Sequence, residues 1–219
     1  MTLADSAYSE LKRLLLSGGL SADHPLTERD VAERLNMSRT PVREALRRLE
    51  SERLLTVDTR RGVIPVRLTQ HEISDLYFMR EVLEGAAARL ACQHATAMEI
   101  LNLKGILEEE AQAMTGGGDM AAINHMLHEA IYRAAHSTFL LRALQSLTDS
   151  TFLLGRSTLT DPSRAAKAHV EHAALIEAIS GRNGNRAEEV ARQHIQAACI
   201  ERMRMLREQS RLKAQDRLP

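Results

Sequence analysis

The spacing of apolar residues divides the chain into two parts near residue 70. From there to about residue 209, apolar positions recur every three or four residues, which predicts helices. Turns rich in glycine or asparagine, and one Asp-Pro pair, separate them. We expect six helices, at about residues 71–95, 97–114, 119–136, 138–157, 163–180 and 186–209. This part of the chain is therefore predicted to be an all-α antiparallel bundle.

The segment 26–66 begins with the pattern of a short helix. Thr27 and Asp30 stand three residues apart, which is a helix-start signal. Asn36 ends the helix, because asparagine tolerates the left-handed conformation better than most residues. The residues that share its apolar face are Val31, Ala32 and Leu35.

A second short helix follows directly. Ser38 is placed to cap it, and Pro41 falls in its first turn, where a missing N–H is harmless. Two short helices joined by a three-residue turn form the helix-turn-helix pattern, in which the second helix presents its first residues to the major groove. The apolar stripe of this second helix consists of Val42, Ala45, Leu46 and Leu49.

Two apolar segments, LLTV and VIPV, then flank the turn DTRRG, which predicts a two-stranded wing with Arg60 and Arg61 at its tip. The chain is therefore expected to be mainly α. We predict a winged helix-turn-helix DNA-binding domain at 1–69, an all-helical effector-binding and dimerisation domain at 70–210, and a polar tail at 211–219.

Arginines on one exposed helix are more often a solvated surface than a nucleic-acid contact. Here, however, they gather at the start of the second helix and at the wing tip, the two places where a winged helix touches DNA. The segment LTERDVAERLNMSRTPVREALRRLE also closely resembles the N-terminal domain of the GntR family of bacterial transcription regulators. The DNA contacts that the wing and this resemblance imply are Arg29, Ser38, Arg39, Thr40, Arg43, Arg60, Arg61 and Gly62.

The charge distribution permits this interpretation, although the formal net charge is zero. Residues 1–70 hold 12 basic and 10 acidic side chains, residues 71–200 hold 11 and 16, and residues 201–219 hold 6 and 3. A mildly basic N-terminal part therefore precedes an acidic body. Aromatic residues make up only 3%, which argues against a protein that stacks single-stranded bases.

The chain has no long apolar run that could cross a membrane, and its first residues do not follow the order of a signal peptide. Cys92 and Cys199 match no zinc-motif spacing, and we expect both to be reduced thiols. These features predict a cytoplasmic protein without a membrane partner.

Two histidines of the second part are expected to face each other. His172 and His194 lie at equal distances from the turn SGRNGN, and residues equidistant from the turn of an antiparallel helix pair lie side by side. Both stand in otherwise apolar stretches. Two buried imidazoles need a shared partner, for which a metal ion is a good candidate. Asn124 and His128 share one helix face, but spacing alone does not bring them to the same place.

The second part resembles the FadR-type ligand-binding domain of GntR regulators, an all-helical antiparallel bundle. In its metal-binding members, Asp/Asn-x-x-x-His and two later histidines hold the ion. By this resemblance the ligands here are Asn124, His128, His172 and His194. The early R-x-x-x-E motif of this domain is present as Arg80 and Glu84.

Asn124 stands where this subfamily more often has aspartate. With neutral ligands only, a divalent ion leaves the site more cationic, which favours a small carboxylic acid as effector. Arg80 could clamp that acid, unless it is simply paired with Glu84. Imidazole and amide ligands suit zinc, nickel, manganese or iron, so the sequence does not identify the metal.

We therefore expect a homodimeric regulator that binds a palindromic double-stranded DNA operator, with an affinity set by an organic acid bound at a metal-containing pocket. One alternative is a regulator for which the metal ion itself is the signal. Another is a metallohydrolase, but the sequence carries no HExxH motif and the winged helix would then have no use. The bundle could also serve dimerisation alone.

Overall fold

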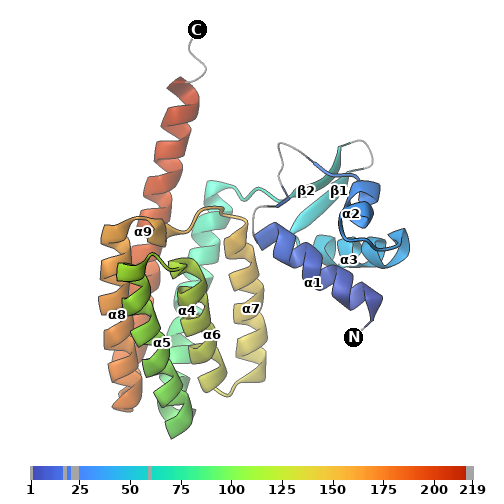
Figure 1. Ribbon diagram of the computed structural model, residues 1–219. Coiled ribbons are helices and arrows are strands. Elements are labelled where there is room, and N and C mark those ends of the chain that lie inside the picture. Colours follow the sequence, from blue (N-terminus) through green and yellow to red (C-terminus); the bar gives the residue numbers. More distant parts are fainter. Residues whose placement is uncertain (1, 17–18, 21–24, 59–60, 216–219) are drawn as a thin grey trace. The chain divides into compact units, whose positions relative to one another are not determined.

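The structure is a computed structural model that describes residues 2–16, 19–20, 25–58 and 61–215. Its contacts divide the chain into two compact units, residues 1–70 with 148–155, and residues 71–147 with 156–219. The chain is mainly α, as predicted, and its one described sheet has two strands (Figure 1).

The first unit contains three helices and a wing. The helices are α1 (Leu3–Leu16), α2 (Glu28–Arg34) and α3 (Arg39–Ser51). The helix α1, which is not among the expected elements, packs along α3. Its apolar residues join the core of this unit, because Ala7 and Leu11 are fully buried together with Leu46 and Leu49 of α3.

The helix-turn-helix has the caps that the sequence indicates, with one difference. Thr27 and Asp30 form a complete capping box at the start of α2, and Asn36 adopts a left-handed conformation with φ of 50°. Ser38 is the N-cap residue of α3, but its side chain makes no capping hydrogen bond. The Ser38 hydroxyl is therefore not committed to the helix end.

The wing consists of β1 (Leu55–Asp58) and β2 (Gly62–Pro65), paired antiparallel with Asp58 opposite Gly62. Gly62 has φ of +93°, and a Cβ atom there would lie 2.6 Å from the carbonyl oxygen of Leu26. The assignment of Gly62 as a DNA contact stays a prediction, and the residue is buried. Its role is to let β2 start directly against the segment before α2.

The second unit is a bundle of long helices lying side by side, in which α9 extends beyond its neighbours (Figure 1). Three of the helices begin with capping residues, Thr96 with Glu99 before α5, Asp119 before α6 and Asp161 before α8. Its elements are α4 (Gln70–His94), α5 (Ala97–Gly116), α6 (Met120–Ala134), α7 (Thr138–Phe152), η1 (Thr158–Thr160), α8 (Pro162–Ser180) and α9 (Gly184–Gln215). The end of α7, from residue 148, belongs by its contacts to the first unit.

The core of the bundle lies between α4, α5, α6, α8 and α9. The helix α5 packs on α6 and α8. The helix α8 packs on α9, to which the turn after Ser180 connects it. Cys92 is buried in this core and Cys199 is half-buried, and both are free thiols. The largest fully buried apolar side chains of the core are Leu103, Leu127, Ile179 and Ile195.

Two predicted boundaries are wrong. The helix expected to reach residue 157 ends at Phe152, and Gly155 turns the chain with φ of +74° into the short helix η1, which the sequence pattern did not indicate. The last helix, expected to end near residue 209, continues to Gln215, so residues 211–215 of the expected polar tail are helical. Residues 216–219 lie outside the described part of the chain.

Candidate metal centre and DNA-binding surface

Three buried histidines from three helices lie together inside the bundle. His128 of α6, His172 of α8 and His194 of α9 are each at most 6% exposed. The ring centroids of His172 and His194 are 4.6 Å apart, so the prediction that they face each other is confirmed. His128 lies 5.2 Å from His194 and 5.5 Å from His172, measured in the same way.

Each of these histidines is oriented by a glutamate. The Nδ1 atom contacts a carboxylate oxygen in every case, so Nδ1–H donates and Nε2 is left as the atom with a free lone pair. The Nε2 atoms of His128 and His172 are buried and have no hydrogen-bond partner in the described structure. The pairs are His128–Glu84 at 2.7 Å, His172–Glu110 at 2.8 Å and His194–Glu171 at 2.6 Å.

The surroundings of two of these histidines, His172 and His194, favour the neutral imidazole, which is the form that binds metal. Burial lowers the pKa of His172, and the Glu110 carboxylate only partly offsets it. Burial also lowers the pKa of His194 to well below its usual range, and the neighbouring His172 and His128 lower it further. In contrast, burial raises the pKa of Glu84, but the adjacent Arg80 and His128 outweigh this and hold the carboxyl ionised.

Each of these glutamates also contacts a second side chain, an arginine or a histidine. Every carboxylate therefore connects a histidine of the cluster to a second positively charged or proton-bearing group, which fixes its orientation. The sequence analysis names Glu84 in the R-x-x-x-E motif but does not mark Glu110, Glu171 or Arg164 as part of the site, although the Glu-His dipeptide at 171–172 is a visible signal. The outer contacts are Arg80 to Glu84 at 2.8 Å, His169 to Glu110 at 2.9 Å and Arg164 to Glu171 at 2.8 Å.

The three histidines fit a metal ion. One ring nitrogen from each lies within 4.8 Å of the other two, a spacing that one ion can bridge. A cavity of about 10 Å³ adjoins His128 and His194, with Glu84 and Tyr132 also in its wall. That volume accommodates a single water-sized species. Buried nitrogen atoms without hydrogen-bond partners are the further observation that fits an ion here.

Asn124 and Arg80 differ in how they relate to this cluster. Asn124 is partly buried and precedes His128 by one turn of α6, so it lies on the same side of that helix. Its role as a fourth ligand stays a prediction. Arg80 is mostly buried and donates to Glu84, and its guanidinium lies 5.3 Å from the centre of the Tyr77 ring. Arg80 is therefore tied to His128 through Glu84.

In the first unit, the start of α3 presents an exposed polar surface. Arg39, Thr40 and Arg43 are all exposed. Glu28 of α2 holds two of them, with Arg43 donating twice at 2.9 and 3.1 Å and Arg39 paired at 3.3 Å. The two arginines thus share one carboxylate, which fixes their side chains side by side at the helix start.

The other candidate DNA contacts surround this surface or lie on the wing. Arg29 is exposed and pairs with Glu33 of its own helix, and Ser38 is exposed at the start of α3. Arg61 is exposed on the wing, where its backbone N–H donates to the Asp58 carboxylate. Arg60 lies outside the described residues.

Comparison with known proteins decides the family. Residues 3–64 match the domain described as bacterial regulatory proteins, gntR family, and residues 75–197, more than half of the chain, match the FCD domain. The chain is a GntR-family protein with an FCD domain. The helical bundle with the histidine cluster is this FCD domain, and the winged helix is the family's DNA-binding module. Members of this family are transcriptional regulators, not enzymes.

Relatives and solved structures agree with this assignment. The chain is 28% identical over 193 residues to the HTH-type transcriptional regulator YdhC of Bacillus subtilis, covering 87% of this chain and 84% of that protein. It is 32% identical over 150 residues to the regulator McbR of Escherichia coli, covering 67% of each. The solved structure of E. coli McbR/YncC has the same fold, with a TM-score of 0.82 at 23% identity over 94% of this chain and 99% of that one.

In the described part of this GntR-family chain, no helix is both long and apolar enough to cross a membrane. The expectation that the protein has no membrane partner is not tested further by this observation.

Proposed function

We propose that the protein is a sequence-specific DNA-binding transcription regulator, and that a small carboxylic acid bound at a metal-containing pocket modulates its affinity for its operator. The proposal of a metal-containing pocket rests on three buried histidines that lie together and whose Nδ1 atoms all contact glutamates. Such an arrangement directs Nε2 lone pairs toward one place and has no evident use without an ion.

The metal would be held by His128, His172 and His194, with Asn124 as the fourth protein ligand. When bound, a divalent ion supplies a Lewis-acidic position that an oxygen of the effector can occupy. The ligand chemistry suits zinc, nickel, manganese or iron. Arg80 donates to Glu84, and Glu84 lines the cavity. We propose that the positive charge of Arg80 favours an anionic effector there.

The DNA-binding surface would consist of Arg39, Thr40 and Arg43 at the start of α3, with Arg61 on the wing. Arginine binds guanine through two hydrogen bonds in the major groove, whereas hydroxyl groups and the helix N-terminus suit phosphates. One recognition helix covers only a short half-site, so a homodimer on a palindromic operator is proposed, with the FCD domain supplying the dimer contact.

The helix α4 connects these activities. It begins at Gln70, directly after the winged helix, and carries Arg80 and Glu84 toward the histidine cluster. A ligand changes operator affinity only if it binds one conformation better than another. We propose that effector binding shifts α4 and so changes the spacing of the two DNA-binding units in a dimer.

Native mass spectrometry with elemental analysis of the purified protein tests the pocket, because the protein can retain both ion and ligand. One divalent ion per chain, together with a small acid, supports the proposal. Protein that was never exposed to chelator, contains no metal and cannot be loaded with any would contradict it.

A metal-sensing regulator is the second candidate, since the same three histidines would serve it. The two functions separate when the metal-loaded protein is titrated with small acids on operator DNA. A change in operator affinity on adding acid at constant metal supports an organic effector. A change on adding or removing metal, with no effect of any acid, supports metal sensing.

A further inference from the structure

Arg164 is a buried arginine whose hydrogen-bonding groups are only partly satisfied by the protein. It lies in the first turn of α8 and is 6% exposed. Its Nη2 atom donates to Glu171, but its Nε and Nη1 atoms are buried and have no hydrogen-bond partner in the described structure. A guanidinium stays charged at any physiological pH, and buried N–H groups without acceptors are unfavourable.

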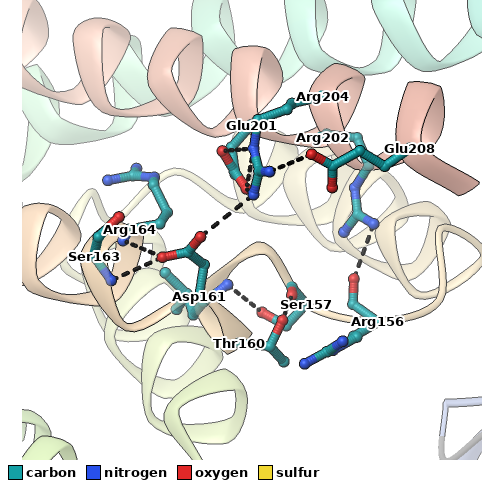
Figure 2. Close-up of polar contacts among 11 residues, drawn as sticks. Arg156, Ser157, Thr160, Asp161, Ser163, Arg164, Glu201, Arg202, Arg204 and Glu208 are labelled. Carbon is teal, nitrogen blue, oxygen red and sulfur yellow. Dashed lines mark hydrogen bonds and ion pairs between the residues drawn. The ribbon is translucent and has the colours of Figure 1, made fainter.

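The polar network at the start of α8 does not supply the missing acceptors. Asp161 accepts from the backbone N–H groups of Ser163 and Arg164 and from the side chain of Arg204, as Figure 2 shows. This carboxylate therefore caps the helix and holds α9. The Arg164 guanidinium takes no part in the network drawn there, since its acceptor is Glu171.

Arg164 is joined to the histidine cluster through a single oxygen atom. The Oε2 atom of Glu171 accepts from Arg164 Nη2 at 2.8 Å and from His194 Nδ1 at 2.6 Å. Arg164 is thus separated from one of the proposed metal ligands by a single carboxylate.

The charged groups around the cluster are the three glutamates bonded to the histidines and the two arginines bonded to those glutamates. Together they favour one added anion once a metal is present. Arg80 and Arg164 are positive, whereas Glu84, Glu110 and Glu171 are negative. With neutral imidazoles, this leaves one surplus negative charge. A divalent cation reverses it to one surplus positive charge, which a single carboxylate would balance. Asn124 adds no charge to the count.

We infer that Arg164 binds the carboxylate of the effector, and that the effector is a small monocarboxylate whose two oxygens divide between Arg164 and the metal ion. The inference rests on the proposed function and assigns the recognition of the anion to a residue other than Arg80. A carboxylate would supply the acceptors that Arg164 Nε and Nη1 lack, and the planar guanidinium matches its geometry.

The test uses full-length, metal-loaded protein and isothermal titration with propionate, with malonate and inorganic phosphate for comparison. The variants are Arg164→Gln, Arg164→Lys and the control Lys167→Gln, which removes a positive charge from an exposed position of the same helix. We expect Arg164→Gln, once loaded with metal, to bind propionate about tenfold to a hundredfold more weakly than the unmodified protein. The affinity of Arg164→Lys for propionate should lie between those of Arg164→Gln and the unmodified protein. Lys167→Gln should bind propionate as tightly as the unmodified protein does.

Arg164→Gln protein that holds its metal and binds propionate with unchanged affinity would overturn the inference. So would loss of metal from this variant with full recovery of propionate binding when metal is restored, because Arg164 would then act only on the ligand His194. If Arg164→Gln does not fold, unchanged propionate affinity of Arg164→Lys would overturn the inference in its place. Tighter binding of malonate than of propionate would refute the single-charge count.

The two proposals fail in different ways. If the unmodified protein binds phosphate but neither carboxylate, and Arg164→Gln does not bind phosphate, Arg164 stands as the anion-binding residue and the carboxylic effector is wrong. If carboxylates bind with equal affinity to all the variants and shift operator affinity, the proposed function stands and the assignment of Arg164 is wrong.

Discussion

His172 and His194 face each other across the α8–α9 pair, with ring centroids 4.6 Å apart, and each directs Nδ1 to a different glutamate. Because both Nδ1 atoms are occupied, the Nε2 atoms are the ones left to bind a ligand. Burying imidazole nitrogens that have no hydrogen-bond or metal partner lowers the stability of the folded protein. Metal binding by this pair is therefore the first prediction.

Replacing His172 by alanine should abolish metal retention and remove the stabilisation that the ion provides. At a free metal concentration about one hundred times its dissociation constant, binding contributes about 2.7 kcal/mol. Thermal unfolding of the unmodified protein should therefore shift down by several degrees on adding chelator, while His172→Ala should not respond. His125→Ala, an exposed histidine of α6, serves as control and should respond like the unmodified protein. A chelator response in His172→Ala would contradict the site.

Asn124→Asp adds a negative charge next to the proposed ion without a large change of shape. It should slow the loss of metal to a competing chelator, because a carboxylate binds a dication more strongly than an amide does. It should also weaken an anionic effector, since the site becomes less cationic. Metal loss at an unchanged rate would show that Asn124 is not a ligand.

Arg43→Ala should weaken binding to operator DNA about tenfold to a hundredfold and relax the preference at one position of each half-site. Glu28→Gln should have a smaller effect in the same direction, because it removes the carboxylate that holds Arg43 and Arg39 in place. Arg61→Ala should weaken binding to operator and scrambled DNA alike. Titrations at fixed salt measure all three. Unchanged operator affinity of a folded Arg43→Ala variant would refute the assignment of the recognition helix.

Sedimentation of the purified protein should give about twice the chain mass of 24.4 kDa at micromolar concentration. The physical reason is that two half-sites are needed for useful specificity. A monomer that still binds a palindromic operator with full affinity would contradict this expectation.

Gly62→Ala should destabilise the wing by about 1–3 kcal/mol, because an added methyl group meets the Leu26 carbonyl oxygen and φ is positive there. The measurement is hydrogen exchange of the Val63 amide, which donates to Leu26 at 2.7 Å. Gly105→Ala is the matched control, since Gly105 lies in α5 with open space around it and the change should be neutral or slightly stabilising. Equal protection of the Val63 amide in both variants would refute the steric argument.

Much of the fold could be predicted because its signals are local. Thr27, Asn36 and the glycine-rich turns mark helix ends through short-range hydrogen bonds and backbone conformation, and the structure places helix ends there. The helix α1 is not among the expected elements, although Ala7, Leu11, Leu14 and Leu15 recur at helical spacing and form its buried face. The short helix η1 could not be predicted in this way, because it follows a left-handed turn at Gly155.

The site divides in the same way. The facing of His172 and His194 follows from one turn, whereas His128 joins them only through the packing of α6 against the rest of the bundle. Glu110 and Arg164 could not be predicted because nothing in their local sequence distinguishes a buried glutamate or arginine from an exposed one. Their burial depends on contacts between α5, α8 and η1.

An ion held by His128 and His172 would close a long loop of chain, because α7 and η1 lie between these two residues in sequence. The same loop contains the segment 148–155, whose contacts place it with the winged-helix unit. Such a cross-link restricts the unfolded chain over the whole loop, so metal binding would favour the folded state beyond the contacts made at the site itself.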